Sequence, residues 1–123
     1  MLQTTLLKNI KSIAQELRIQ KPEEQEIISF FERFKRNSSL KYVYVGALSK
    51  HLKYDISLTY EFLESLTNLN SLTRIYEFRC PNSSFRKIFY SNYTSLPDKI
   101  LCDECEEEFI TRDYIYVIYE VKF

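Results

Sequence analysis

Three cysteines are the residues of this chain whose type and spacing suit a defined chemistry. Cys80 opens a Cys-Pro-Asn-Ser turn, and after 18 further residues Cys102 and Cys105 form a Cys-x-x-Cys pair. Two Cys-x-x-Cys pairs about 15 to 20 residues apart are typical of a tetrahedral zinc site, because each short turn brings two thiolates to one side of the ion. Ser83 stands where the fourth cysteine would be. The pattern therefore predicts a zinc site at Cys80, Cys102 and Cys105 with one ligand missing.

The missing ligand leaves more than one interpretation of this segment open. A serine hydroxyl stays protonated near neutral pH, so the fourth donor would be His51, Asp103, Glu104 or water. Alternatively the turns persist without metal, and aromatic packing replaces the roughly 10 kcal/mol of folding free energy that a structural zinc ion supplies. The aromatic residues available for such packing are Phe85, Phe89, Tyr90, Phe109, Tyr114 and Tyr116. A disulfide between Cys102 and Cys105 is a third option, which a reducing compartment disfavours.

The composition restricts the class of protein and its compartment. A chain of 123 residues, 45% hydrophobic and 28% charged, is sufficient for one compact domain or two small lobes. It contains no apolar run of about 18 residues and no secretory leader pattern at its start, so we expect a cytoplasmic protein with reduced thiols. Seventeen basic and seventeen acidic side chains cancel, so no overall charge attracts nucleic acid or an anionic membrane.

Two amphipathic helices are predicted before the cysteine segment. Apolar residues recur at three- and four-residue spacing in residues 3–19, which predicts a helix that faces the core or mediates dimerisation. Pro22 and the glutamates after it suit the first turn of a second helix, which is expected to end near Arg36. A break at residues 37–39 and a short extended stretch at 42–45 follow.

The next segment has the order of elements found in a well-known family. It predicts a short helix at 45–52, a turn at 53–56, a longer helix at 57–68 and an extended stretch at 73–79. Over roughly residues 24–79 this order resembles the winged helix-turn-helix family, which includes prokaryotic regulators and adaptors that bind no DNA. The residues that carry the resemblance are Ala47, Leu48 and Leu52, then Asp55, Ile56 and Ser57, and finally Leu63, Leu66 and Leu72.

The cysteine turns alternate with extended runs at 75–79, 85–90 and 114–123, an order that resembles a zinc ribbon. The whole chain resembles a winged-helix domain whose wing has grown into a ribbon, a combination found in prokaryotic regulators and in accessory proteins of bacterial defence systems. We therefore expect an α+β fold. Residues 1–79 would form the N-terminal helix and a winged-helix core, and residues 80–123 a small antiparallel sheet of degenerate zinc-ribbon type.

The longer helix at 57–68 bears on whether the protein binds DNA. In DNA-binding members of the family the second helix of the motif enters the major groove. Residues 57–68 contain no Lys or Arg, and Glu61 and Glu64 would repel phosphates there. The cations able to flank a duplex lie elsewhere, at Lys50, Lys53, Arg74, Arg79, Arg86 and Lys87. We therefore expect an accessory or adaptor protein that binds a protein partner or a second copy of itself, with a DNA-binding transcriptional regulator as the alternative.

A partner surface is expected on the terminal strand, because an exposed aromatic strand edge is either covered or paired with another molecule. Its candidate contact residues are Tyr114, Tyr116 and Ile118. The acidic run at 103–108 is either a solvated loop or a docking patch for a basic partner. One histidine, no Gly-rich phosphate loop and no nucleophile beside a recognisable base predict that the protein is not an enzyme, with no small-molecule substrate and no membrane contact.

Overall fold

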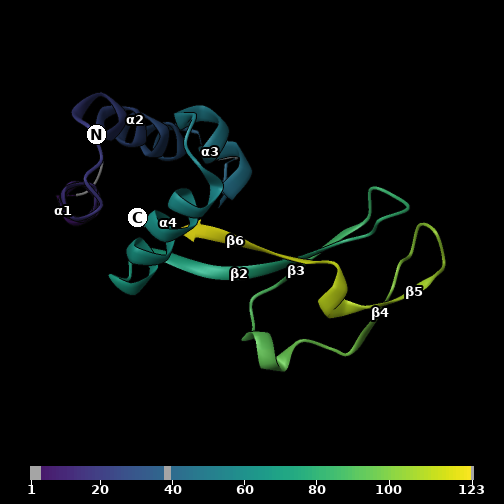
Figure 1. Cartoon of the computed structure of the whole chain (residues 1–123). Coiled ribbons are helices and arrows are strands. Elements are labelled where there is room, and N and C mark those ends of the chain that lie inside the picture. The colour runs from purple at the N-terminus through teal and green to yellow at the C-terminus, as the bar shows by residue number, and fades with distance from the viewer. Residues whose placement is uncertain (1–3, 38–39, 123) are drawn as a thin grey trace. The chain divides into compact units, whose positions relative to one another are not determined.

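The structure, a computed structural model, describes residues 4–37 and 40–122 and shows a mixed α+β protein (Figure 1). Its helices are α1 (Thr4–Glu16), α2 (Lys21–Arg36), α3 (Val45–Leu52) and α4 (Ile56–Asn68). Each lies where the sequence predicts a helix. Gln3, Ser38, Ser39 and Phe123, which the predicted elements include, lie outside the described residues. Among the described helices, none combines the length and the apolar character needed to cross a membrane.

The strands of the described residues form two sheets. The larger has the order β1-β6-β2-β3 and the smaller pairs β4 with β5. The strands are β1 (Tyr42–Val43), β2 (Leu72–Arg79), β3 (Arg86–Phe89), β4 (Lys99–Leu101), β5 (Glu108–Ile110) and β6 (Ile115–Val121). β6 lies between β1 and β2, but β1 pairs only with Glu120 and Tyr119, so the expectation of a sheet edge is wrong for this end of the terminal strand.

The chain divides into two compact units. Unit 1 contains the described residues up to 73 and those from 119 onward, and unit 2 contains residues 74–118. Figure 1 shows how the chain leaves the helices along β2 and returns to them along β6. The sequence predicts a domain boundary after residue 79 and predicts that the whole terminal strand belongs to the ribbon. The structure differs because the end of β6 returns to pair with β1, through Glu120 opposite Tyr42 and Tyr119 opposite Val43.

Unit 1 has a core built from the apolar stripes of its four helices. Each helix turns one face inward because its apolar residues recur at helical spacing. Asp55 begins α4 as an N-cap, and its Oδ1 accepts a hydrogen bond of 2.6 Å from the backbone N–H of Ser57. The core residues of the helices include Leu6, Ile10, Ile13, Ile27, Phe31, Leu48, Phe62, Leu63 and Leu66.

The return strand β6 is attached to α4 by a polar contact inside unit 1. Tyr119 is fully buried and its hydroxyl donates a short hydrogen bond to Oε2 of Glu64. A hydrogen bond from a hydroxyl to an ionised carboxylate is stronger than one between two neutral groups, so this contact helps hold β6 against α4. Glu64 is therefore half-buried, and of the two glutamates predicted to face a groove only Glu61 is exposed.

Unit 2 has a separate aromatic core around Phe78 of β2. The Phe78 ring centroid lies 6.2 Å from that of Phe85, 6.1 Å from that of Phe109 and 6.5 Å from that of Tyr114. Edge and tilted contacts at these distances are the arrangements that aromatic pairs prefer. Cys80, Ile100 and Cys102 are buried in the same cluster. The cysteines are thus embedded in the core of this unit.

Candidate metal centre

Two backbone turns of matching geometry carry the cysteines. In the first turn, residues 80–85, the backbone N–H of Cys80 donates to the carbonyl oxygen of Phe85 at 3.0 Å. In the second turn, residues 102–107, the N–H of Cys102 donates to the carbonyl oxygen of Glu107 at 2.9 Å. Both bonds join a cysteine to the residue five positions later. The turns therefore share this closing hydrogen bond, with Cys80 matching Cys102, and the second turn has a further bond of 2.8 Å from the Glu106 N–H to the Cys102 carbonyl oxygen.

Ser83 occupies the position in the first turn that corresponds to Cys105 in the second. The backbone N–H of Phe85 donates to Ser83 Oγ at 3.2 Å, and the backbone of Glu107, at the matching position, acts to lower the pKa of the Cys105 thiol. Ser83 Oγ also lies 3.3 Å from Cys102 Sγ. The side chain of Ser83 therefore points into the cluster at the fourth corner, as the missing fourth cysteine would.

The three sulfurs are close enough together to hold one zinc ion. Their Sγ atoms all lie within 4.8 Å of one another, and those of Cys80 and Cys105 are 3.6 Å apart. Zinc bound tetrahedrally at about 2.3 Å places its sulfurs roughly 3.8 Å apart. Backbone N–H groups of Asn82 and Cys105 donate to the sulfurs of Cys80 and Cys102, each at 3.4 Å. Such donors stabilise thiolates, so the residues present fit zinc.

The pKa values of the thiols are shifted apart by these contacts. Burial raises the pKa of Cys102, but hydrogen bonds from Ser83, the backbone of Cys105 and the two other thiols outweigh burial and lower it to about 7. For Cys105, the backbone bond from Glu107 lowers the pKa, but burial and its interactions with the other two thiols raise it to about 11. These shifts favour the thiolate on Cys102 relative to Cys105.

The other predicted donors are not part of this cluster. Within residues 4–37 and 40–122, the metal-capable group that contains these thiols consists of Cys80, Cys102 and Cys105 alone. His51 Nε2 instead lies 3.1 Å from Glu26 Oε2 in unit 1. The fourth corner is therefore left to Ser83 or to water.

Glu104 and Glu107 link the two turns on the outside of the cluster. Glu104 Oε2 accepts hydrogen bonds from the backbone N–H and hydroxyl of Ser84, at 3.1 and 3.2 Å. Glu107 Oε2 accepts one of 3.0 Å from the Asn82 side-chain amide. Two members of the acidic run therefore hold the first turn against the second. Sequence reasoning missed this role, because the partners lie at least 20 residues away.

Comparison of the chain with protein-family models, with curated proteins and with solved structures finds no match. No family is thereby identified.

Two of the six predicted nucleic-acid cations share a buried carboxylate. Arg79 Nε and Arg86 Nη1 both donate to Oε1 of Glu77, at 2.7 and 3.0 Å, and the Glu77 side chain is only 4% exposed. The Arg79 guanidinium also lies 4.1 Å from the centroid of the Tyr116 ring. Two of the six cations are therefore committed to a buried carboxylate. The other four, Lys50, Lys53, Arg74 and Lys87, are exposed and come from α3, its C-cap, β2 and β3.

The three predicted partner residues on the terminal strand differ in exposure. Tyr116 is 47% exposed, whereas Ile118 is fully buried and Tyr114 packs against Phe109 in the core of unit 2 at 5.4 Å between ring centroids. Alternation along a strand places neighbouring side chains on opposite faces, and here both faces are partly covered. Ile118 is therefore not available to a partner, and of the three Tyr116 is the most exposed.

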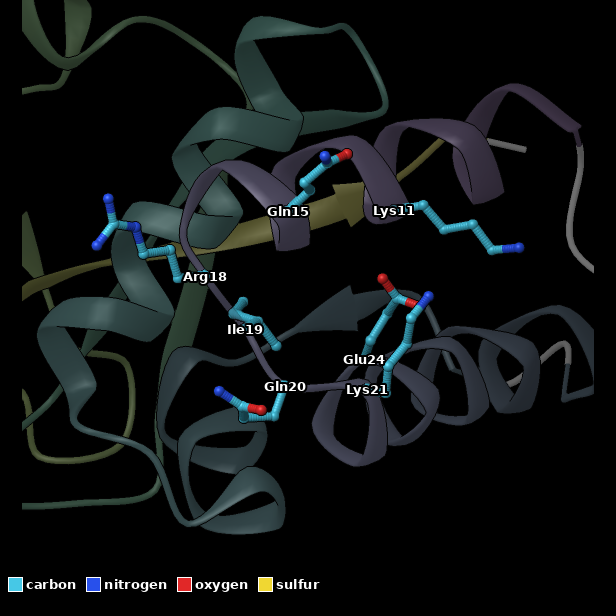
Figure 2. Close-up of a pocket in the computed structure, with 7 residues that line it drawn as sticks. All are labelled: Lys11, Gln15, Arg18, Ile19, Gln20, Lys21 and Glu24. Carbon is cyan, nitrogen blue, oxygen red and sulfur yellow. The ribbon is translucent and has the colours of Figure 1, made fainter.

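A pocket of about 530 Å³ lies in unit 1 where α1 ends and α2 begins (Figure 2). Sequence reasoning did not single it out. Lys21 Nζ lies 3.7 Å from the Glu24 carboxylate, and Figure 2 shows these two side chains next to each other while Lys11 and Arg18 point in opposite directions. The lining therefore offers no converging donors for an anion. Its residues are Lys11, Gln15, Arg18, Ile19, Gln20, Lys21 and Glu24.

Proposed function

We propose that unit 1 is a winged-helix domain and that unit 2 is a zinc-ribbon-like insertion in its wing. The order of elements from α2 to β2, followed by the return of the chain along β6 between β1 and β2, supports this assignment. In a winged helix the wing connects the two long strands of the sheet. Here that connection is residues 80–114, which lie within unit 2 and include both cysteine turns.

Cys80, Cys102 and Cys105 would hold a structural zinc ion, with Ser83 or a water molecule at the fourth corner. The equivalence of the two turns is the main support for this centre, together with sulfur separations that suit tetrahedral zinc. The ion would join the two turns and so stabilise a unit whose apolar core is small. It would be structural, since the cysteines lie inside an aromatic cluster.

The protein itself would act without catalysis, as an accessory module that binds a protein partner through α4. The exposed face of this helix carries the proposal. Ile56 is 53% and Tyr60 37% exposed, one helical turn apart, and Glu61 adjoins them. No cation lies between Ile56 and Asn68. A face of this composition suits a protein surface and repels phosphates.

Affinity purification from the cells that produce the protein tests this role. We expect a tagged wild-type chain to retain a specific protein, and the double variant Ile56→Asp/Tyr60→Asp to lose it. Leu101→Asp is the matched control, because Leu101 is 59% exposed but lies in unit 2. Loss of the partner in the control alone would contradict the role of α4. An electrophoretic mobility shift of duplex DNA at low salt, lost when Lys50 and Lys53 are changed to Glu, would support the DNA-binding regulator instead.

A further inference from the structure

We propose that Cys80 and Cys105 form a reversible disulfide when the protein meets a peroxide, exchanging the metal link between the turns for a covalent one. The exchange rests on the proposed zinc centre, whereas the disulfide rests on the sulfur geometry alone. The two Sγ atoms are in contact at 3.6 Å, and 25 residues separate the two cysteines. A disulfide requires a separation of about 2.05 Å, so a small movement of the two turns is sufficient.

The burial of the three thiols determines which of them an oxidant reaches first. Cys105 is half-exposed, whereas Cys80 is 7% and Cys102 0% exposed. Oxidation of cysteine depends on access as well as on ionisation. Ionisation favours Cys102, but Cys102 is fully buried, so Cys105 is the sulfur most accessible to a small peroxide, and Cys80 is the neighbour in contact with it.

The reaction balances with hydrogen peroxide as the oxidant. The Cys105 sulfur attacks one peroxide oxygen, which gives a sulfenic acid at Cys105 and releases one water molecule. The Cys80 sulfur then attacks the sulfenic sulfur, so that the S–S bond forms and a second water molecule leaves. Two electrons pass from the two thiols to the peroxide, and a thiol reductant reverses the step.

Oxidation would preserve the connection between the turns while removing the metal. Zinc would lose two of its three thiolate ligands, and Cys102 would remain as a free thiol beside Ser83. The new bond would join the first turn to the second, as zinc does. Oxidation would therefore release zinc without separating the turns.

Peptide mapping after peroxide treatment tests the proposal directly. Trypsin cuts after Arg79 and Arg86, and after Lys99 and Arg112, which separates Cys80 from the other two cysteines. A disulfide from Cys80 joins peptides 80–86 and 100–112, whereas one between Cys102 and Cys105 stays within the second peptide. We expect the joined pair, with loss of two hydrogen atoms per chain and reversal by a reductant.

Two matched variants identify the partner of Cys80. We expect Cys102→Ser to keep the link between the peptides and Cys105→Ser to lose it. The opposite result, or a bridge confined to peptide 100–112 in the wild-type chain, would overturn the proposal. Conversion of Cys105 to higher oxygen acids without any bridge would overturn it as well.

Zinc measured before and during oxidation separates this inference from the proposed function. Zinc-loaded protein is expected to release its ion to a chromogenic chelator in step with formation of the bridge. If zinc is bound but no bridge forms, the metal centre stands and the disulfide proposal fails. If no zinc is bound but the joined peptides still appear, the disulfide stands and the proposed metal exchange fails.

Discussion

Ser83 determines how strongly the centre holds a metal ion. It occupies the position in the first turn that Cys105 occupies in the second, and its hydroxyl lies 3.3 Å from the Cys102 sulfur. A neutral hydroxyl is a weaker zinc donor than a thiolate. The centre is therefore expected to bind zinc more weakly than a site with four cysteines.

Replacing this serine tests its position. We expect Ser83→Cys to tighten zinc binding by on the order of 100-fold, because a thiolate would complete the tetrahedron. Competition with a chromogenic chelator measures the change. Ser84→Cys is the control, since the Ser84 side chain contacts Glu104 outside the cluster. Equal effects of the two substitutions would show that Ser83 does not occupy the fourth corner.

Individual residues of the centre were predictable from the sequence, but their surroundings were not. The spacing of Cys80, Cys102 and Cys105 is sufficient to bring them together, because each pair of ligand positions lies within a short turn. The direction in which Ser83 points depends on backbone hydrogen bonds that no spacing specifies. The roles of Glu104 and Glu107 depend on contacts across the cluster, and these too became evident only in the structure.

Strands β2 and β3 of unit 2 carry an arginine pair that needs a carboxylate. Arg79 and Arg86 lie directly opposite each other in the register of these strands. Like charges in that arrangement destabilise a sheet. Glu77 offsets the repulsion, because its buried carboxylate accepts a hydrogen bond from each guanidinium. The three side chains therefore form a structural cluster on this hairpin.

Removing the carboxylate should weaken the hairpin. We expect Glu77→Gln to lower the free energy of unfolding by about 2 kcal/mol, less than for a fully buried pair, because Arg79 and Arg86 are 30% and 54% exposed. Urea denaturation followed by circular dichroism gives the value. Glu61→Gln on the exposed face of α4 serves as the control, with an expected change below about 0.5 kcal/mol. An unchanged stability for Glu77→Gln would refute the structural role of the cluster.

At the scale of elements, periodicity predicted the helices better than turn chemistry predicted the loops. The sequence has a single Gly, and Asn and Asp are the other residues that most readily adopt positive φ. The structure instead places Arg18, Lys53, Asn70 and Glu106 at positive φ. Arg18, Lys53 and Asn70 each follow a helix, and the N–H of the next residue donates to the carbonyl oxygen five positions back. The positive φ values at these three residues therefore belong to helix C-terminal caps, which form here without glycine. The β4–β5 pair was also missed, because each strand has only three residues.

The two units are expected to respond differently to loss of metal. Unit 1 has a core of helices that contains no cysteine, whereas both cysteine turns belong to unit 2. Membership of β6 in both units was not predictable, because a continuous aromatic strand gives no sign of where its pairing partner changes. The resemblance to a winged helix supplies the order of elements but not this division.

Chelation in reducing buffer should therefore loosen unit 2 selectively. We expect hydrogen exchange to speed up most between residues 80 and 110, while the amides of α1, α2 and α4 keep their protection. The reason is that the proposed zinc ion would join turns that otherwise rest on a small aromatic cluster. Mass spectrometry of peptides from treated and untreated protein measures the difference. A uniform rise in exchange over both units would contradict separate stabilisation.

The zinc content of the intact protein tests the central claim most directly. Protein purified without a chelator is measured by elemental analysis beside Cys102→Ser, which removes a thiolate of the centre. We predict one zinc ion per wild-type chain and a large loss of zinc in the variant. Wild-type protein that folds normally and contains no zinc, even after addition of the ion, would contradict the account.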